Sequence, residues 1–292
     1  MKMAHARVTV SEGESAEQTR WTGGRAEAPD LSVIKIGGSL VSQKDRAGHL
    51  DLDLVDRYAR LMAELWTTAP GKVVLVVGGG AIGHGAVREL DPGDRFAALG
   101  LTRATFTVKW AWVEALSRHG VPGFPVQVGG LCVLRDDRPA AQLGAVEELL
   151  RTGCLPVLSG DCVMTPEGRL EVFGSDRVPE IFLGAERTFR RIRVAVLTDV
   201  PGVLRDGPGG NRTIPFIDAD DPEGARTHIW AAAAHDTSGA MAGKVASLQE
   251  LARSGAECVI LRGAPDMAGL DFLVQPMSAW SEGIPRTLIA RR

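Results

Sequence analysis

Short apolar, β-branched segments alternate along this chain with amphipathic helical patterns, and this alternation restricts the available folds more than any other feature. The apolar runs lie at residues 32–38, 73–80, 124–128, 155–161, 194–200 and 257–263. Helical patterns occur between several of them, at residues 51–66, 102–119, 145–152 and 239–254. Buried parallel strands joined by helices form α/β sheets that bind ligands at the carboxyl ends of their strands. We therefore predict an open, mainly parallel sheet sandwiched between helices, with the site on the strand-to-helix loops.

Charge and cysteine usage narrow the class of protein further. The 292 residues carry 33 basic and 36 acidic side chains, for a formal net charge of -3, which argues against generic binding to nucleic acid. The four cysteines show no CxxC spacing and no histidine at ligand spacing, so we expect neither a protein-bound zinc site nor a disulfide framework. No stretch reaches roughly 18 consecutive apolar residues. We expect a cytoplasmic, soluble protein with no membrane partner.

The first 30 residues differ from the rest of the chain. They are polar and rich in glycine and charge, without a sustained period. Such composition is typical of a flexible terminus. We expect a flexible leader over residues 1–30 and a folded region over residues 31–292.

The segment IKIGGSL places a lysine and two glycines at the end of an apolar run. The backbone amides of Gly37 and Gly38 can form an anion-binding nest, and Lys35 adds a positive charge beside it. This combination suits a phosphate group. The alternative is a strand lysine whose aliphatic stem lies buried beside a tight turn, and the segment alone does not decide between the two.

A second glycine-rich segment, VVLVVGGGAIGHG, also follows an apolar run. Gly78, Gly80 and Gly83 match the GxGxxG pattern of dinucleotide-binding folds, with Asp94 as a candidate ribose partner, so an oxidoreductase stays open on this segment. We favour a second phosphate nest, with His84 at the opening of a helix donating to an anionic substrate oxygen. A structural role for this histidine is the alternative.

Two further segments combine a helix start with charged residues. Ser175, Asp176 and Arg177 precede a proline at a predicted first helical turn, and Asp176 can hold two lysines or share in Mg²⁺ coordination. The segment HDTSGAMAGK ends in Lys244 and places hydroxyl groups at another helix start, where the helix dipole favours anions. Ordinary helix capping is the alternative in both places.

Several anion-binding segments with lysines in one chain indicate phosphoryl transfer. This chemistry depends mostly on positioning and on cations that face the transferring group. The sequence has no GxxxxGK[ST] motif, neither the HRD nor the DFG motif of protein kinases, and no GxSxG elbow. P-loop kinases and protein kinases are therefore excluded at the motif level.

Five segments resemble the amino-acid kinase superfamily in order and spacing: IKIGGSL, GGGAIGHG, FGSDRVPE, LTDVPGVL and DTSGAMAGK. The histidine of GGGAIGHG resembles the branch that contains isopentenyl phosphate kinases and fosfomycin resistance kinases, whose acceptors are phosphates or phosphonates. The resemblance to the fosfomycin resistance kinases is the closer one and covers residues 32–282. It implies the amino-acid kinase fold, ATP and Mg²⁺ as cofactors, and a homodimer. We expect an acceptor-side lobe over about residues 31–160 and a nucleotide-side lobe over about residues 161–292.

Carried over by position, the resemblance implies roles for individual residues. Lys35 and Lys244 would contact the β- and γ-phosphates of ATP, and Asp176 would orient both lysines. Lys44 would lie near the transferring group. The remaining implied roles are amide donors around the reacting phosphoryl group at Gly37, Gly38, Gly78 and Gly79, acceptor contacts at His84, Ser175, Arg177 and Ser238, and nucleotide contacts at Thr198 and Asp199.

The expected function is an ATP- and Mg²⁺-dependent kinase that phosphorylates a small phosphonate, fosfomycin or a biosynthetic relative. Two departures from the relatives leave the acceptor open: Ser238 stands where they carry threonine, and Gly174 where they carry serine. An isopentenyl phosphate kinase is the alternative of the same class. A nucleotide-binding sensor without transfer activity is the alternative of another class.

Overall fold

The computed structural model describes residues 28–42, 48–91, 93–185, 188–206, 210–221, 224 and 240–292. Residues 1–27 of the expected leader lie outside these ranges, as do the expected site residues Lys44 and Ser238.

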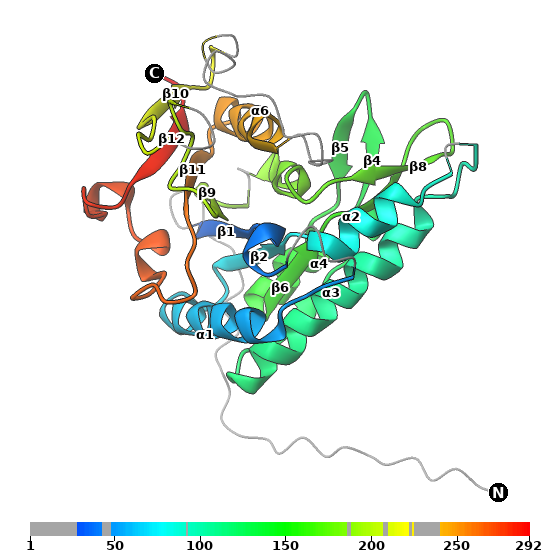
Figure 1. Ribbon diagram of the computed structural model, residues 1–292, viewed down its shortest axis with the longest axis horizontal. Helices are drawn as coiled ribbons and strands as arrows, with labels where there is room; N and C mark the ends of the chain where they lie inside the picture. Colours follow the sequence, from blue (N-terminus) through cyan, green and yellow to red (C-terminus); the bar gives the residue numbers. More distant parts are fainter. Residues whose placement is uncertain are drawn as a thin grey trace, which may run out of the picture.

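An eight-stranded sheet forms the centre of the described part of the chain (Figure 1). Its order is β10-β12-β11-β9-β1-β2-β6-β3, and all neighbouring strands are parallel except β11 and β12. The strands are β1 (Asp30–Ile36), β2 (Val73–Val77), β3 (Gly123–Pro125), β6 (Leu155–Ser159), β9 (Arg191–Thr198), β10 (Phe216–Asp218), β11 (Glu257–Arg262) and β12 (Arg286–Ala290). Each of the predicted apolar runs supplies a strand, which confirms the predicted mainly parallel α/β sheet.

A second, four-stranded sheet is absent from the sequence-based prediction. Its order is β5-β4-β7-β8, with β4 (Cys132–Arg135), β5 (Arg138–Ala141), β7 (Asp161–Met164) and β8 (Leu170–Phe173). These strands are short and include polar positions, as in RPAA, so no apolar run marks them. The small sheet joins residues on both sides of the lobe boundary expected near residue 160.

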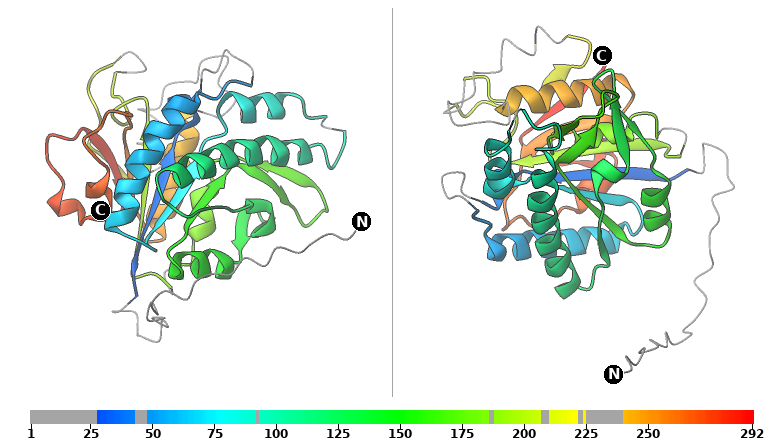
Figure 2. Two further views of the ribbon diagram at one scale, coloured as in Figure 1. Left: turned by 90° about the horizontal axis from the view of Figure 1, so that it is seen from below. Right: turned by 90° about the vertical axis from the view of Figure 1, so that its right-hand side faces the viewer.

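Helices cover both faces of the large sheet (Figure 2). α1 (Leu52–Thr68) and α3 (Leu99–Arg118) pack against each other on one face. The other face is covered by α4 (Gly144–Arg151), η3 (Val178–Phe182) and α6 (Ala240–Arg253). α2 (Gly80–Arg88) begins where β2 ends. All four predicted helices are present. No helix within the described ranges has both the length and the apolar character needed to cross a membrane.

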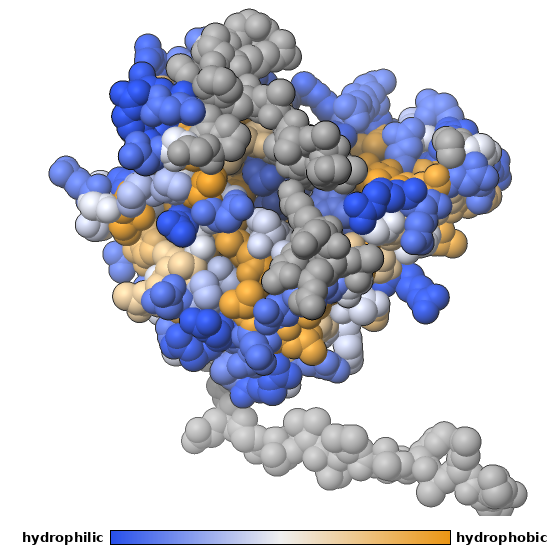
Figure 3. Space-filling view, viewed as in Figure 1, coloured by the Kyte–Doolittle hydropathy of each residue, from blue (hydrophilic) through white to orange (hydrophobic). Residues whose placement is uncertain are grey.

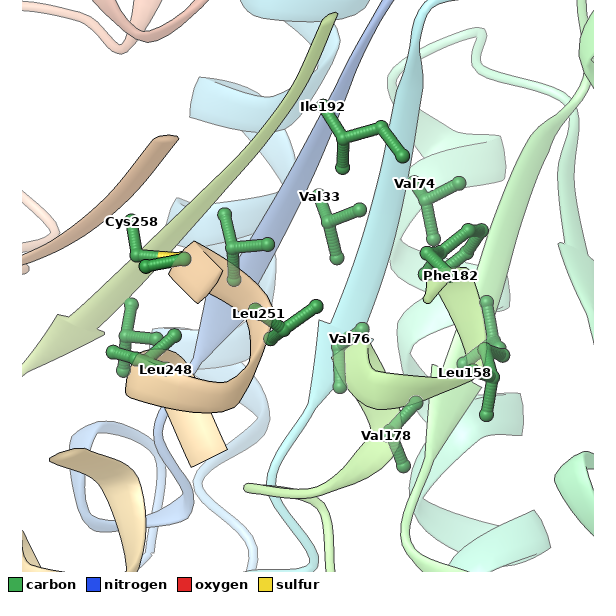
Figure 4. Packing of buried hydrophobic residues seen from close by; sticks show 14 of the residues in the cluster. Val33, Val74, Val76, Leu158, Val178, Phe182, Ile192, Leu248, Leu251 and Cys258 are labelled. Atoms are coloured by element: carbon green, nitrogen blue, oxygen red, sulfur yellow. The ribbon is translucent and has the colours of Figure 1, made fainter. Parts of the chain in front are cut away.

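Alternate side chains of β1 enter two separate cores. Val33 packs in the core beneath α6, where Leu251 also lies (Figure 4). Ile34 and Ile36 belong to the core beneath α1 and α3. Because the side chains of a strand alternate between its faces, Lys35 points to the same face as Val33. The strand therefore delivers one buried ammonium group to the α6 face, close to its own carboxyl end.

Lys109 of α3 is a buried lysine that sequence analysis did not single out. It has 0% exposure, and its ammonium group donates to the Val126 carbonyl oxygen at 3.0 Å and to Gln127 Oε1 at 2.6 Å. Burial lowers the pKa of Lys109 to about 8, although the negative charge of Asp161 opposes this effect. These bonds tie α3 to the loop after β3.

We expect Lys109→Met to remove a pH dependence of the free energy of unfolding. The pKa of Lys109 is about 8 in the folded protein, below the ordinary lysine value of 10.5. The unfolded chain binds more protons between these values, so wild-type stability rises with pH in this window. The gain from this group is at most roughly 3 kcal/mol. Urea unfolding at about pH 7.5 and about pH 9.5 measures it, and an equal pH response in both proteins would contradict the buried charge.

Candidate active site

The carboxyl ends of β1, β2, β6 and β9 meet at one edge of the large sheet. The chain passes from β1 to β2 and β6 on one side and returns to β9 on the other side of β1. Open α/β sheets bind ligands where the strand order reverses in this way. A cavity of about 660 Å³ lies at this point, lined by α2, α3, α6, the β4–β5 hairpin and the segments that follow the strands. The site therefore lies on the predicted side of the sheet.

Two glycine loops approach each other closely in the wall of the cavity. A Cβ atom on Gly38 would lie 2.5 Å from the backbone nitrogen of Gly80. One on Gly78 would lie 2.2 Å from the backbone nitrogen of Gly38. Only glycine allows the two backbones to come so near. The loop after β1 and the start of α2 thus form one continuous surface of bare backbone.

The backbone amides of Gly37 and Gly78 are not available to donate hydrogen bonds to a ligand on this surface. They donate to the carbonyl oxygens of Leu197 and Ile36, at 3.0 and 2.9 Å. These bonds extend the strand pairing beyond the ends of β1 and β2. Both glycines line the cavity, but the prediction that their amides donate to a phosphoryl group is wrong, because the sheet already uses them.

The amides of Gly38 and Gly79 have a different environment. Gly38 opens the short helix η1 (Gly38–Leu40), and Gly79 is the N-cap residue of α2. The first N–H groups of a helix have no acceptor within it. Of the four glycines to which sequence analysis assigned anion-binding amides, Gly38 and Gly79 therefore lie where an amide can donate to an anion in the cavity.

Three charged side chains from distant segments meet at the cavity. Lys35 Nζ donates a hydrogen bond to Asp176 Oδ1, and Lys244 Nζ lies 3.3 Å from Asp176 Oδ2. The side chain of Lys35 is 3% exposed, and those of Asp176 and Lys244 are each 15% exposed. The predicted meeting of these residues is confirmed. Two ammonium groups against one carboxylate leave net positive charge facing the cavity.

Burial and charge act in opposite directions on this group. Burial favours the neutral form of Asp176, but the charges of Lys35 and Lys244 outweigh it and hold the pKa of the carboxyl below its usual value. Burial also lowers the pKa of Lys35, against the attraction of Asp176. Asp176 is therefore ionised at neutral pH and holds together two cations that would otherwise repel each other.

Asp176 does not cap a helix. The N-cap residue of η3 is Arg177, and no side chain makes a capping hydrogen bond there. The carboxylate of Asp176 is engaged by the lysines, and its backbone oxygen accepts from Ser247 Oγ of α6 at 3.0 Å. The capping interpretation is wrong for this residue, because its side chain faces the cavity.

His84 and Ser175 line the cavity on the side of β2 and β6. α2 begins at Gly80, so His84 lies one turn inside the helix, not at its opening as predicted. Its side chain is half-buried. Ser175 follows β8, and its backbone nitrogen would lie 2.9 Å from a Cβ on Gly160, the residue after β6. Two hydrogen-bonding side chains thus share one end of the cavity.

Arg177 also lines the cavity, but its guanidinium group is engaged. It donates to the Glu180 carboxylate at 3.1 Å, to Asp137 Oδ1 at 2.9 Å and to the Asp137 carbonyl oxygen at 2.6 Å. The group also lies over the Phe173 ring, 5.0 Å from its centroid. Direct contact with an acceptor, as expected from sequence, would require these bonds to break. Arg177 instead fixes the β4–β5 hairpin to η3.

Thr198 is the last residue of β9 and Asp199 follows it, on the opposite side of β1 from His84. Thr198 is 4% exposed, lines the cavity and donates to Asp199 Oδ1 at 2.9 Å. Asp199 itself is exposed. Asp94, the candidate ribose partner of a dinucleotide fold, is also exposed, and its carboxylate accepts from the Phe96 amide at 2.8 Å. It does not line the cavity, which argues against the oxidoreductase alternative.

Sequence analysis missed several residues that line the cavity: Ser39, Leu101, Thr105, Asp136, Asp137, Arg138, Phe173, Ser247 and Glu250. Ser247 and Glu250 could have been identified from the sequence, because they follow Lys244 at helical spacing and share its face of the helix. No sequence pattern could have identified the residues of the β4–β5 hairpin, because only the small sheet brings them to the site.

The sequence and the fold were compared with those of known proteins. Residues 30–262 match the family that is described as "Amino acid kinase family". The isopentenyl phosphate kinase of Methanothermobacter thermautotrophicus is 26% identical, over 80% of this chain and 91% of the relative. The isopentenyl phosphate kinase of Haloferax volcanii is 32% identical, over 76% of this chain and 88% of the relative. A solved structure of isopentenyl phosphate kinase shares the fold, with a TM-score of 0.62 and 22% identity over 80% of this chain and 91% of that chain.

We expect Asp176→Asn to lower the free energy of unfolding by roughly 3 kcal/mol, because buried Lys35 loses its counter-charge. Urea unfolding with a spectroscopic readout measures the change. The control is Asp137→Asn, which removes an exposed carboxylate and should cost less than about 1 kcal/mol. Similar costs for the two variants would contradict a buried, charge-paired Asp176.

Proposed function

Because the chain belongs to the amino acid kinase family and is a phosphotransferase, we propose that it transfers the γ-phosphoryl group of ATP to an anionic oxygen of a small acceptor that carries a phosphate or phosphonate group. The main support is the arrangement in which Asp176 holds Lys35 and Lys244 together in the cavity. Phosphoryl transfer needs cations that face the charge spread over the transferring group.

We place ATP on the β9 side of β1. Thr198 lines the cavity there, and Lys244 reaches the centre from α6. In this proposal Lys35 and Lys244 contact the β- and γ-phosphates, the Gly38 amide contributes a hydrogen bond, and Asp199 lies beside the nucleotide. Paired ammonium groups and bare backbone are the chemistry that a polyphosphate needs.

We place the acceptor on the β2 and β6 side, against His84, Ser175 and the Gly79 amide. A phosphate or phosphonate oxygen is already ionised at neutral pH, so the reaction needs no general base. His84 then positions the acceptor and offsets its charge for in-line attack on the γ-phosphorus. Lys44 near the transferring group and Ser238 at the acceptor stay predictions from the resemblance, as does a cytoplasmic location.

Mg²⁺ fits this site as an ion that arrives with ATP. The described part of the chain contains no group of three or more His, Cys, Asp or Glu residues that could hold a metal ion. The Asp176 carboxylate, which sequence analysis considered as a ligand, is engaged by two lysines. Mg²⁺ typically keeps several waters and binds through substrate phosphates, whose charge it neutralises. The contribution of this chain is to hold the remaining phosphate oxygens.

Two acceptors fit the proposal. A small phosphonate such as fosfomycin is supported by the motifs that resemble fosfomycin resistance kinases. Isopentenyl phosphate is supported by the names of the relatives and by the apolar side chains of Val87, Leu101 and Phe173 in the cavity wall. Thr105 adds a buried hydroxyl group to the same wall.

A phosphorus NMR experiment tests the proposal. The purified protein is mixed with ATP and Mg²⁺, and fosfomycin, other small phosphonates and isopentenyl phosphate are offered in separate samples. We expect ADP and a new phosphoanhydride signal with a phosphonate. Turnover on isopentenyl phosphate alone would favour the second acceptor. ATP binding without ADP formation on any acceptor would overturn the proposal in favour of a nucleotide sensor.

We expect His84→Ala and Lys244→Ala each to lower kcat by roughly 10²- to 10³-fold while the protein stays folded, as for the loss of one preorganised electrostatic contact. Steady-state assays with circular dichroism spectra measure both properties. The matched controls are His119→Ala, at the end of α3, and Lys72→Ala, exposed before β2. Wild-type rates in either site variant would refute the assigned role.

We also propose that the protein is a homodimer, as the resemblance implies, and that α3 forms the interface. Most of the face in Figure 3 is hydrophilic, with smaller apolar areas between. On α3, Phe106 and Trp110 are 43% and 47% exposed and stack on each other. Arg103 and Glu114 lie on the same exposed stripe. Two antiparallel copies of α3 would set Phe106 opposite Trp110 and Arg103 opposite Glu114, so the stripe complements itself, as a two-fold interface requires.

We expect Arg103→Glu and Glu114→Arg each to weaken the dimer, because each places like charges opposite one another. The double variant should restore it, since both pairs are then opposite in sign again. Sedimentation velocity over a range of concentrations measures the monomer fraction. A double variant no tighter than the single variants would exclude this arrangement of helices.

A further inference from the structure

Ser42 lies between the two glycine loops without lining the cavity itself. It follows η1 and is 8% exposed. Its hydroxyl group donates to the Gly38 carbonyl oxygen at 2.9 Å and accepts from the Ala81 amide at 3.0 Å. One hydroxyl group thus bonds to the loop after β1 and to the first turn of α2.

The bond from the Ala81 amide replaces the N-capping hydrogen bond that α2 does not make with its own N-cap residue. Gly79 is the N-cap residue of this helix and has no side chain to accept from the first amides. Ser42 provides the missing acceptor from a different segment, a capping interaction between loops. The direction of both bonds is fixed, because a carbonyl oxygen can only accept and an amide can only donate.

The Ser42 hydroxyl group lies directly against the start of α2. A Cβ atom on Gly80 would lie 2.2 Å from Ser42 Oγ, so the helix start packs directly against the hydroxyl group. Gly80 has a φ of 53°, a conformation that suits glycine. The backbones of the loop at Gly38 and of the start of α2 already lie against each other, and the Ser42 hydroxyl group bonds to both of them.

The two segments that Ser42 joins have different tasks in the proposed reaction. Gly38 follows Lys35 on the phosphate-donor side, whereas α2 carries His84 on the acceptor side. In-line transfer requires donor and acceptor at a set distance, and a misplacement of about 1 Å can cost roughly 10²-fold in rate. We infer that Ser42 is a positioning residue whose hydroxyl group holds the phosphate-donor loop and the acceptor helix in a fixed relative position. This inference rests on the proposed function.

Thr287 provides a matched control. Its hydroxyl group accepts from the Val203 amide at 2.8 Å and donates to the Ile214 carbonyl oxygen at 2.7 Å, and the residue has 0% exposure. It thus joins two segments by the same pattern of bonds. Thr287 lies on β12, outside the cavity lining. Ser42→Ala and Thr287→Val each remove one buried bridging hydroxyl group, but only the first joins the two halves of the site.

The experiment measures kcat, KM for ATP and thermal stability for the wild type, Ser42→Ala, Ser42→Thr and Thr287→Val. We expect Ser42→Ala to lower kcat by about 10- to 100-fold with KM for ATP changed less than about threefold, the pattern of an interaction that matters in the transition state. Ser42→Thr keeps the hydroxyl group and should retain most of the turnover. Thr287→Val should lose stability with kcat within about twofold of the wild type.

The outcomes separate this inference from the proposed function. Ser42→Ala with the kcat of Thr287→Val, or Ser42→Thr as slow as Ser42→Ala, would overturn the role of the hydroxyl group. If the wild type phosphorylates no acceptor, the proposed function fails, and hydrogen exchange of the peptide spanning residues 78–84 then tests Ser42 directly. Faster exchange there in Ser42→Ala, but not in Thr287→Val, supports the inter-loop contact; unchanged exchange overturns it. If Ser42→Ala does not fold, Ser42→Cys, which keeps only a weak hydrogen-bonding group, takes its place in both measurements.

Discussion

The carboxylate of Asp176 lies between two ammonium groups, and the arrangement of the cavity depends on this contact. Lys35 is almost fully buried on a central strand, where an unpaired charge would be strongly unfavourable. Lys244 comes from α6, on the far side of the same carboxylate. Asp176 therefore compensates the burial of one lysine and draws in the other. The result is a positive, partly water-excluded site in which hydrogen bonds to phosphate oxygens gain strength from the low local dielectric.

The wall of the cavity depends on further ion pairs. Arg138 Nη2 lies 3.0 Å from Glu250 Oε1 of α6, and Arg177 holds Asp137. Asp136 and Asp137 adopt positive φ angles of 51° and 58°, as both central residues of a two-residue hairpin loop of type I′ do. Aspartate is common at the first of these positions, whereas glycine is usual at the second. Asp137, at the second position, is a partner of Arg177, and Arg138 pairs with Glu250, so the hairpin tip is fixed to both η3 and α6.

The arrangement of the cavity indicates the class of reaction more clearly than it indicates the identity of the acceptor molecule. The lysine pair and the glycine loops present positive charge and bare backbone to the cavity, which suits transfer between two anionic groups, and His84 and Ser175 also line it. In the proposed function, the acceptor lies against a few side chains of α2, α3 and β8 that line the cavity. These residues make no contribution to the central charge pairing, so one fold can serve several acceptors through changes in this wall alone.

Much of the architecture and part of the site were predictable from the sequence. The apolar runs predicted six strands of the large sheet, and the helical period predicted α1, α3, α4 and α6, since burial of one face requires these periods. The glycines at 38, 78 and 80 were predicted as parts of two anion-binding loops, and the structure shows that they also allow the two loops to approach each other closely. The sequence also predicted that Asp176 holds Lys35 and Lys244 together, which the structure confirms.

Only the tertiary structure decided which groups are available for chemistry. The amides of Gly37 and Gly78 are used by the sheet, the guanidinium group of Arg177 is engaged by carboxylates, and Lys109 is buried. None of this follows from local spacing. Lys35 and Asp176 are separated by 141 positions in the sequence, and the pairing of such groups depends on how sheets and helices pack. Sequence periodicity determines where the chain buries its apolar side chains, whereas packing determines which polar groups already have partners and which remain to bind a ligand.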